Sequence, residues 1–492
     1  MRTSTARVMT SGQWAHQRAA VSAFGCLIAV MVGVLSATRY GVLVGSALFG
    51  LAFLAVAVMT YLRDPVLAFI WLWILELINA PLSATFGYSS SAGKEVRQGD
   101  EVLVLLFLGL TIWRTMRTNA PMPALRFVVP GIAIGLFGVI GAIVHAVPLT
   151  VGATGALLGL KLWVMIVAAL MLPWKLGDVD RVYSVMTKIG VAVAVIGLAD
   201  FVTHGAVSRA LHTSNYSVSG GEAYRAEAVH SIFPSPGEYS LFMSLLFAFA
   251  FAKFMSSARK ADLVLALVFA GSVLLSLRLK GVLSLVAVVV VVGVVYGTTS
   301  GRRAIIGLVI GALLVAVAFS VEGSVISKQL STYGSSGTTA RARLYSTGWK
   351  IADKDFPIGV GFGRFASYPS RIYYSPVYYE YKLSTVYGLS PTYTHFIDDT
   401  SWPSVIGETG YGGFVAYVLG LLVVAIAMIR RLRTVASDVT WVPLAALCAL
   451  TVLVADSVGE ASLFSWLATA TVAMIFGPMM IATKPTSRDV MA

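Results

Sequence analysis

The sequence contains few charged residues. Asp, Glu, Lys and Arg make up 12% of its 492 residues, whereas apolar residues make up 57%. A soluble domain usually carries about 25% charged residues, because its surface must face water. The shortage of charge, together with long apolar runs, excludes an ordinary soluble protein and indicates a polytopic membrane protein.

Cysteine is almost absent as well. Cys26 and Cys448 both fall inside apolar runs, where a small hydrophobic role is expected. Neither has a second thiol or a histidine cluster beside it in the sequence, so we expect no disulfide, no metal site and no redox pair. No cofactor is predicted.

The apolar runs are long enough to cross a bilayer, which takes roughly 20 helical residues. They lie near residues 19–37, 40–61, 65–84, 101–116, 126–147, 150–172, 186–203, 237–255, 261–277, 281–297, 304–320, 411–429, 440–457 and 461–482. In hydrocarbon the backbone must satisfy its own hydrogen bonds, so we expect helices even where Val and Ile dominate. The predicted fold is an all-α bundle of about 12 to 14 transmembrane helices, the first of them an uncleaved helix rather than a signal peptide.

Basic residues alternate between the predicted loops. If the N-terminus is inside, Lys and Arg gather in the inner loops, at Arg63, Arg114, Arg117, Arg126, Lys175, Arg181, Lys188, Lys253, Arg259, Lys260, Arg302, Arg303, Arg430, Arg431, Arg433, Lys484 and Arg488. Short cytoplasmic loops of membrane proteins show this bias. We therefore expect both termini inside. The bias and contact with anionic membrane lipids account for the net charge of +13, so no nucleic acid is expected as a partner.

Three parts follow from this topology. Residues 1–320 form a transmembrane bundle with an outer loop at 204–236, residues 321–403 form a large extracytoplasmic loop with short helices, and residues 404–492 form the C-terminal transmembrane helices. The large loop holds ten of the twenty tyrosines, eight basic residues and six acidic residues. Lipid would not tolerate such a segment, so we expect the function to lie there.

Some basic residues are expected on the outer side, against the general bias. Arg278 and Lys280 occupy a very short turn between two spans, Arg225 lies in the outer loop, and Lys94 and Arg97 follow the third span. One interpretation is that these side chains extend to the headgroups. The other is an anion site at the membrane surface, where the usual anions are lipid phosphates.

The start of the large loop predicts a helix. Thr338 or Thr339 is a suitable N-cap for the run ARARLYSTGWKIADKD, which carries Arg341 and Arg343 and ends before Pro357. A glycine-rich run, GVGFG, follows. It predicts either a tight structural turn or a close backbone approach to a ligand, but no strand and helix flank it as in a dinucleotide-binding motif.

Aromatic residues crowd the rest of the loop. Tyr374, Tyr379, Tyr393 and Trp402 are candidates for a glycan surface, since aromatic rings stack on the C–H faces of sugars and tyrosine hydroxyls bond to sugar oxygens. The alternative is a belt of aromatic residues at the membrane interface.

Several of these motifs together resemble one family. The turn containing Arg278, the helix start at Arg343, the run 357–363, Trp402 with Pro403, and the run 407–413 are similar to the O-antigen ligase and polymerase superfamily. The resemblance covers residues 270–415, about a third of the chain. It implies a helical bundle of the GT-C type in the bacterial cytoplasmic membrane, with the site at its outer face.

The resemblance also implies an activity: metal-independent transfer of a glycan from a polyprenyl-pyrophosphate donor to a lipid-linked acceptor. Cations would bind the pyrophosphate, and the candidates are Arg278, Arg343, Arg341, Lys280 and Arg225. His395 or Asp399 would be the general base, and Asp398 would orient the base or the acceptor. Adjacent Asp398 and Asp399 are also a pattern for a divalent cation, but two neighbouring carboxylates are more typical of a solvated turn.

Family ligases carry a His-Asn pair about eleven residues before a Gly-x-x-Gly motif, a position that falls on Asp399 and Thr400 here. This departure favours a polysaccharide polymerase over a ligase, and a chain-length regulator is a further candidate partner. A transporter or flippase is a more distant alternative, and a passive structural subunit another. Transport would need ionisable groups near the bilayer midplane. Only Glu76 and Lys161 lie deep, where we expect them to pair, and no inverted repeat or pair of broken helices is apparent.

Overall fold

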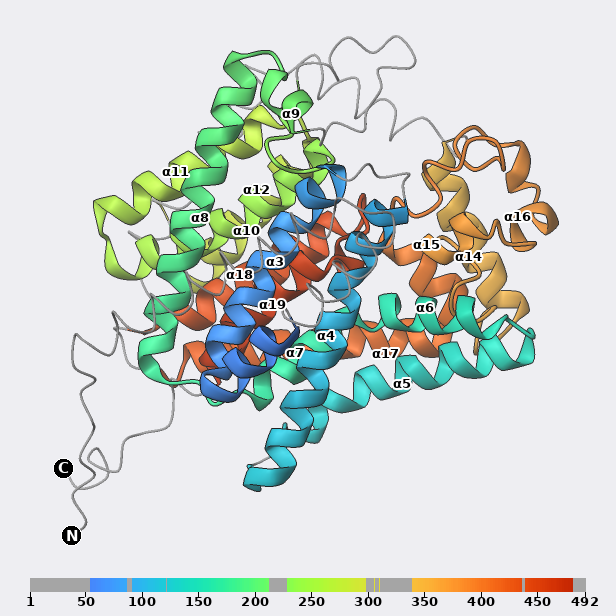
Figure 1. Ribbon diagram of the computed structural model, residues 1–492, viewed down its shortest axis with the longest axis horizontal. Coiled ribbons are helices and arrows are strands. Elements are labelled where there is room, and N and C mark those ends of the chain that lie inside the picture. Colours follow the sequence, from blue (N-terminus) through green and yellow to red (C-terminus); the bar gives the residue numbers. More distant parts are fainter. Residues whose placement is uncertain are drawn as a thin grey trace, which may run out of the picture. The chain divides into compact units, whose positions relative to one another are not determined.

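The computed structural model describes residues 54–85, 91–120, 122–211, 228–297, 305, 309, 339–435 and 439–480. These residues form helices, with one isolated bridge between Ser390 and Tyr393 and no strand (Figure 1). The expected all-α fold is confirmed for this part of the chain. The chain divides into two compact units, Met1–Ala68 and Phe69–Ala492.

In the first unit, residues 54–68 are described. Leu54–Arg63 is an apolar helix, and α3 (Pro65–Thr85) begins two residues later and runs on into the second unit. The Asp64 side chain accepts a hydrogen bond from the Leu67 amide at 3.0 Å. This is the geometry of an N-cap, which satisfies an amide that the helix itself leaves unpaired.

The second unit contains helices that can cross a membrane by length and composition. Among the described residues, five are long and apolar: α5 (Leu125–Val144), α8 (Leu176–Val202), α10 (Pro236–Ser257), α12 (Leu279–Gly297) and α17 (Ser401–Leu432). A bent pair adds a sixth, α6 (Leu149–Gly159) with α7 (Lys161–Met171). The chain is therefore a helical membrane protein. The count of 12 to 14 spans stays a prediction, because the run near 19–37 and all but residues 305 and 309 of the run near 304–320 lie outside the described residues.

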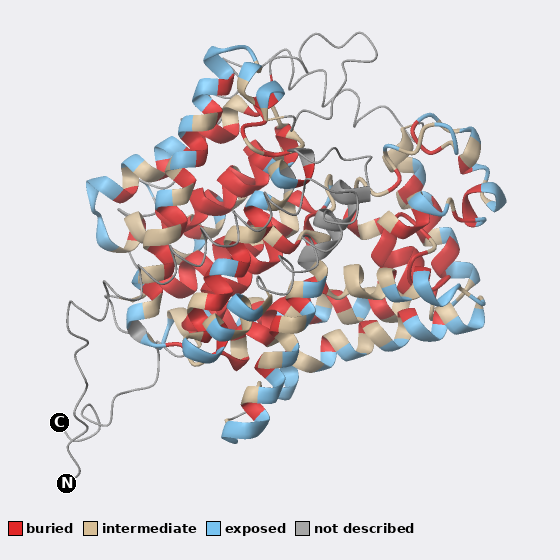
Figure 2. Ribbon diagram, viewed as in Figure 1, coloured by how far each residue is buried: buried red, intermediate tan, exposed pale blue. Residues whose placement is uncertain are grey.

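Three helices form the buried centre of this unit: α10, α18 (Trp441–Asp456) and α19 (Trp466–Met479). Figure 2 shows them almost entirely as buried residues. α10 packs on α18 and on α11 (Lys260–Leu275), while α19 packs on α7. Helices such as α5 and α17 instead leave large apolar side chains exposed. Such faces suit contact with lipid.

Among the described helices, three begin earlier than their apolar runs predict. α4 (Ser91–Thr118), α8 and α17 each start ten residues before the runs near 101–116, 186–203 and 411–429. Polar residues extend α4 and α8 beyond the apolar stretch. At the start of α8 the Asp178 carboxylate accepts from the Lys175 amide at 2.8 Å, which caps the helix.

Among the described residues, two of the membrane helices are broken, although no pair of broken helices is apparent from the sequence. α6 and α7 meet at Leu160 with a bend of 57°. α17 is interrupted at Gly410, where φ is 62° and ψ is −165°. Neither break contains proline, the usual sequence signal for one.

The glycine-rich run stabilises the break in α17. The amides of Val360 and Gly361 donate to the carbonyls of Gly407 and Glu408, both at 2.9 Å, just before the break. A Cβ at Gly410 would lie 2.4 Å from the Pro357 carbonyl oxygen, so only glycine permits this approach. Carbonyls released inside a membrane need such partners. The run is therefore a structural turn packed against helix backbone, the first of the two interpretations.

Residues 339–400 form a compact layer, called here the tyrosine-rich layer. α14 (Ala340–Lys354) lies in it, and the Thr339 hydroxyl oxygen accepts from the Ala342 amide at 3.3 Å. The predicted helix and its cap are confirmed. The short helices α15 (Tyr368–Ile372) and α16 (Val377–Glu380) follow, over a small core of buried apolar side chains. α14 packs on α17, which holds the layer at one end of the helices (Figure 1).

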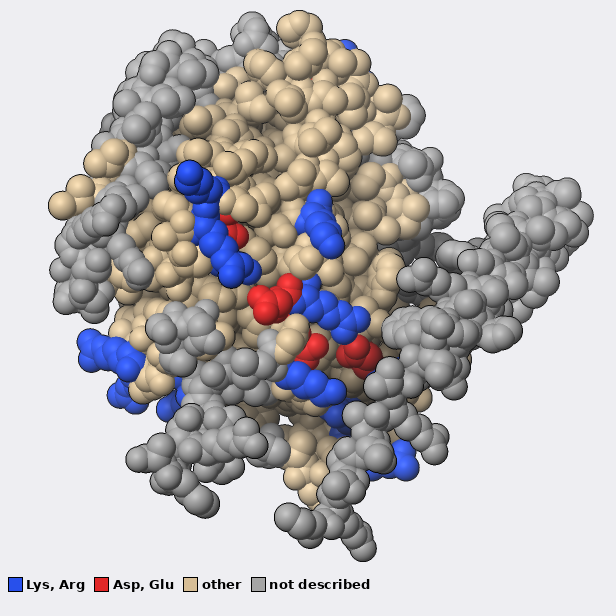
Figure 3. Space-filling view, turned by 90° about the vertical axis from the view of Figure 1, so that its left-hand side faces the viewer, with Lys and Arg blue, Asp and Glu red and all other residues tan. Residues whose placement is uncertain are grey.

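Basic side chains gather at the other end of the helices. Lys253, near the end of α10, lies 3.8 Å from Asp180 in α8 and 4.8 Å from the ring centre of Trp441 in α18. Near the end of α17, Arg431 donates to the Met480 carbonyl at 3.4 Å. Figure 3 shows Lys and Arg beside a few carboxylates on the side of α8 and α11. Alternating basic loops predict this arrangement.

Candidate functional site

Several helix ends meet beneath the tyrosine-rich layer. The segment 457–465, between α18 and α19, contacts the other helices that end here. The Ser401 amide at the start of α17 donates to the Ser457 carbonyl at 3.3 Å, and the Tyr345 hydroxyl of α14 donates to the Val458 carbonyl at 2.9 Å. These bonds bring α14, the start of α17 and the end of α18 to one place.

Lys280 brings a fourth helix, α12, to the same place. Its Nζ donates to Glu460 Oε2, and Asp456 Oδ1 lies 3.7 Å away. Asp456 is fully buried at the end of α18. A Cβ at Gly237, in the first turn of α10, would lie 2.7 Å from Glu460 Oε2 and 2.9 Å from Lys280 Nζ. The lack of a side chain at this position lets α10 approach the ion pair.

Two further ion pairs lie at the junction of the layer and α17. Two guanidinium nitrogens of Arg341 donate to Asp399 Oδ2, the Nε at 2.9 Å. Arg371 Nη1 lies 3.1 Å from Asp398 Oδ1. Adjacent aspartates thus bind separate arginines. Among the described residues, no group of three His, Cys, Asp or Glu side chains is placed to hold a metal ion.

The ionisation of Asp399 links these pairs. Burial raises the pKa of Asp399 to about 6, although Arg341 favours the charged form. Glu460 raises this pKa further and Lys280 lowers it, so both charges lie within range of the carboxyl group. At neutral pH the carboxylate is mostly ionised, yet it remains a stronger base than an exposed aspartate.

Arg278 completes the set of basic residues. Burial lowers the pKa of the nearby His230 to about 4, and the charge of Arg278 lowers it further while Asp200 opposes the change. Arg278 also helps to keep Glu460 ionised. We call Arg278, Lys280 and Arg341 the cation cluster.

Two buried polar atoms beside this cluster have no hydrogen-bond partner among the described residues. They are Arg278 Nε and Thr400 Oγ1. Buried polar atoms in proteins are nearly always paired, and a bound ion or a catalytic role is among the explanations for an exception. Three helix N-termini, those of α10, α12 and α17, also lie here. Their positive dipole ends favour an anion beside the basic side chains.

His395 lies elsewhere in the layer. It is exposed, and its ring packs on Tyr393 with 4.5 Å between ring centres. Residues 395–399 form turns rather than a helix. The helical spacing that would place His395 and Asp399 on one face is therefore absent, and Asp399 is the candidate base that lies with the cations.

The other predicted cations are placed differently. Arg343 lies on α14 two residues after Arg341, but its side chain is exposed. Arg225 lies outside the described residues. Lys94 and Arg97 lie within α4 rather than in a loop.

The candidate glycan residues divide into two groups. Tyr379 is 57% exposed and packs edge-on against Tyr374, whose hydroxyl donates to the Leu389 carbonyl at 2.8 Å. Tyr393 stacks on the exposed Tyr387 with 5.0 Å between ring centres. These tyrosines form an aromatic surface on the layer.

Trp402 belongs to the second group. Its ring packs between Phe414 and Tyr417 of the same helix, each 5.9 Å away, and its Nε1 donates to Ser457 Oγ at 2.8 Å. These contacts join α17 to the end of α18. Trp402 supports the site from within the bundle rather than from the aromatic surface.

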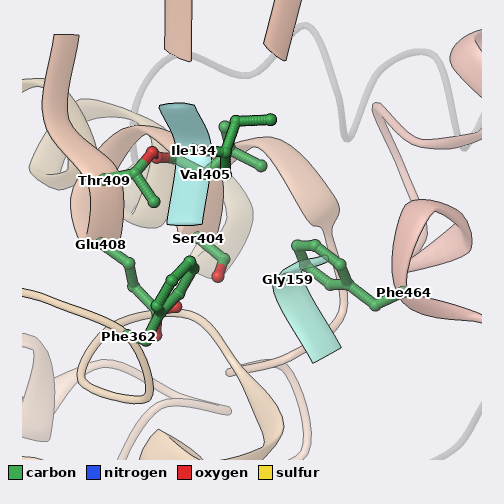
Figure 4. A pocket seen from close by; sticks show the side chains of 8 residues that line it. All are labelled: Ile134, Gly159, Phe362, Ser404, Val405, Glu408, Thr409 and Phe464. Atoms are coloured by element: carbon green, nitrogen blue, oxygen red, sulfur yellow. The ribbon is translucent and has the colours of Figure 1, made fainter. Parts of the chain in front are cut away.

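A small cavity lies near the break in α17 (Figure 4). Glu408, Ser404 and Phe362 lie on one side of it, and Gly159 and Phe464 on the other. Its volume of about 10 Å³ leaves room for about one water molecule. It is too small for a sugar or a diphosphate.

The carboxylate beside this cavity is already hydrogen-bonded. Glu408 Oε1 accepts from Ser367 Oγ at 2.6 Å and from the Phe365 amide at 3.0 Å. Both donors come from the loop that follows the glycine-rich run. Glu408 therefore holds the tyrosine-rich layer against α17.

One basic residue lies deep among the helices. Lys161, at the bend between α6 and α7, has its Nζ 4.0 Å from Glu101 Oε1 and 4.5 Å from the ring centre of Trp466. An acidic residue thus accompanies the buried charge, as its cost in the membrane requires. The pairing of Lys161 with Glu76 stays a prediction.

Sequence reasoning missed Asp456 and Glu460. They are four residues apart at the end of an apolar run, in the sequence DSVGE. Buried cations need counter-charges, so the presence of Arg278 and Lys280 at the same membrane boundary was the available signal. Comparison of the chain with known protein families and with curated proteins found no match in either case.

Proposed function

We propose that the protein transfers a glycan from a polyprenyl-pyrophosphate carrier to the hydroxyl group of a lipid-linked acceptor. One observation carries this proposal: the cation cluster lies at the end of membrane-crossing helices beside an aspartate of raised pKa. A lipid-linked diphosphate presents its charge at that depth. Guanidinium and ammonium groups are suitable donors to phosphate oxygens.

The chemistry requires a base and a stabilised leaving group. Asp399 takes the proton of the acceptor hydroxyl while the hydroxyl oxygen forms a bond to the anomeric carbon of the donor. The bond from that carbon to the pyrophosphate oxygen breaks, and its electron pair leaves with the polyprenyl pyrophosphate. Arg278, Lys280 and Arg341 stabilise the charge that develops there.

Asp399 suits the role of base better than His395 does. Its pKa of about 6 leaves it ionised at neutral pH and still basic enough to accept a proton. His395 packs on the aromatic surface instead. Asp398, held by Arg371, would position the acceptor or the loop that carries Asp399.

Polymerisation is the form of transfer that we favour. The chain resembles the O-antigen ligase and polymerase superfamily, but it has an acidic residue, Asp399, at the position where ligases of that superfamily carry histidine. The acceptor would then be a second lipid-linked repeat unit, and the exposed tyrosines would bind its sugars. The site would face outward from the bacterial cytoplasmic membrane, with a GT-C type bundle below it and a chain-length regulator as a candidate partner. Ligation to a lipid or a protein is the nearest alternative.

Lipid-linked glycan transport is a second candidate function, and two observations favour it. α6 and α17 belong to broken helices, and Lys161 with Glu101 forms an ion pair deep among the helices. Transporters place their sites at such breaks. In α17, however, backbone carbonyls at the break accept hydrogen bonds from the glycine-rich run, so these carbonyls are not available to bind a substrate.

Purified protein with a lipid-pyrophosphate-linked repeat unit tests the proposal. A polymerase gives a ladder of longer glycans, whereas a ligase gives a single transfer to another acceptor. A transporter gives no new glycosidic bond and moves the substrate across vesicle membranes. The proposal predicts the ladder, and the absence of any transfer product would contradict it.

A further inference from the structure

The carboxylate of Glu460 lies among the cations of the proposed site. Lys280 Nζ donates to Glu460 Oε2. Burial alone would raise the pKa of Glu460, but the charges of Lys280, Arg341 and Arg278 lower it below its usual value. All three members of the cation cluster therefore act on this one side chain.

The charges at the site are balanced without any ligand. The cation cluster carries three positive charges, and Asp399, Asp456 and Glu460 supply three carboxyl groups around it. A site with this balance attracts a pyrophosphate weakly, because each carboxylate repels it at short range. For the anion to bind tightly, one carboxylate must move away from the cations.

The three carboxylates differ in their freedom to move. Asp399 accepts from two nitrogens of Arg341, and Asp456 is fully buried in the last turn of α18. The Glu460 side chain is 23% exposed and has the longer stem. Its backbone is held, since the Ser401 hydroxyl donates to the Glu460 carbonyl at 3.0 Å. Of the three, the Glu460 carboxylate is therefore the one that a side-chain rotation, without backbone movement, would withdraw.

We propose that the Glu460 carboxylate is an internal counter-ion that occupies the anion site in the free protein and is displaced by the pyrophosphate of the ligand. The inference rests on the proposed function in that the ligand is a diphosphate. It assigns Glu460 a regulatory role: the residue keeps Lys280 compensated until a phosphate arrives. The buried Arg278 Nε, which has no hydrogen-bond partner among the described residues, then gains an oxygen acceptor.

Glu460 could instead support anion binding. If its carboxylate only holds Lys280 in position, removing its charge disorders the lysine and weakens anion binding. The two roles predict opposite changes in the affinity for pyrophosphate, so one substitution distinguishes them. Glu460→Gln removes the charge and keeps nearly the same shape.

Calorimetric titration of the detergent-purified full chain with inorganic pyrophosphate measures this change in affinity. We expect Glu460→Gln to bind pyrophosphate about tenfold tighter than the wild type, a difference within reach of one removed carboxylate near the site. Lys280→Ala should lose most of the binding. Glu380→Gln, which removes an exposed carboxylate paired with Lys354, is the matched control and should leave affinity unchanged.

Equal or weaker binding by Glu460→Gln would overturn the inference, as would an absence of pyrophosphate binding in both proteins. Glu460→Asp serves if the glutamine variant does not fold, because the shorter carboxylate reaches Lys280 less well and should give an intermediate affinity. Pyrophosphate binding involves no glycan. A protein that behaves as expected here but forms no glycosidic bond would contradict the proposed function and leave the counter-ion role standing.

Discussion

At the scale of single residues, Asp399 shows how two effects compete at one carboxyl group. Burial disfavours the charged form, while the Arg341 guanidinium stabilises it, and the balance leaves a pKa of about 6. A base that takes a proton near neutral pH needs a pKa in this range. From the sequence alone, either His395 or Asp399 could be the general base.

The pH dependence of transfer follows from this pKa. Asp399 must be ionised to accept a proton, so we expect kcat/KM to fall as pH decreases through about 6. Arg341→Gln removes the charge that favours ionisation, so the acid limb should move to higher pH while the overall rate falls. The measurement is kcat/KM as a function of pH for both proteins.

His395→Asn is the control for this profile. Its ring packs on Tyr393, away from the cation cluster, so the acid limb should keep its position. An acid limb that disappears in His395→Asn but persists in Asp399→Asn would make histidine the base.

At the scale of elements, some helices follow from the sequence and others do not. α14 was predictable because its cap, Thr339, and its apolar spacing are local signals. The break in α17 was not, because it depends on a glycine-rich run some fifty residues earlier whose amides bond to the Gly407 and Glu408 carbonyls. Hydropathy identifies an apolar run, but it cannot predict a hydrogen bond from a distant segment of the backbone.

Gly410 tests this account of the break. Gly410→Ala places a Cβ 2.4 Å from the Pro357 carbonyl oxygen at a φ of 62°, so both the contact and the backbone resist it. We expect a loss of roughly 1 to 3 kcal/mol or more of folding free energy. Thermal unfolding of the detergent-purified protein measures the change as a lower midpoint.

Gly109→Ala is the matched control. Gly109 lies in α4, and a Cβ there meets no atom within 4 Å. It should leave the midpoint unchanged or raise it slightly, since alanine favours helix. Equal losses in the two variants would mean that the break in α17 has no special backbone requirement.

At the scale of the whole molecule, the distribution of charge separates two ends. Basic helix ends gather around Lys253 and Arg431, and the tyrosine-rich layer lies at the opposite end of α17. Alternating apolar runs and basic loops predicted this division. They did not predict the partners within the site: Lys280 and Glu460 are 180 positions apart, and only the packing of α10, α12 and α18 brings them together.

Cysteine labelling in cells tests the orientation. In a background with Cys26 and Cys448 replaced, Ser346→Cys in the layer should react with a membrane-impermeant maleimide added to intact spheroplasts. Thr434→Cys at the basic end should react only after the membrane is opened. Both positions are exposed, so access to the reagent decides the result. The reverse pattern would place the layer in the cytoplasm.

The rate of glycan transfer from a polyprenyl-pyrophosphate donor, measured for matched charge variants, tests the central claim most directly. Arg278→Ala should lower the rate about 100-fold or more, because one donor to the leaving group is lost. Lys354→Ala removes an exposed lysine of the same layer and should leave the rate unchanged. Equal rates in Arg278→Ala and the wild type, or no transfer by the wild type, would contradict a catalytic role for the cation cluster.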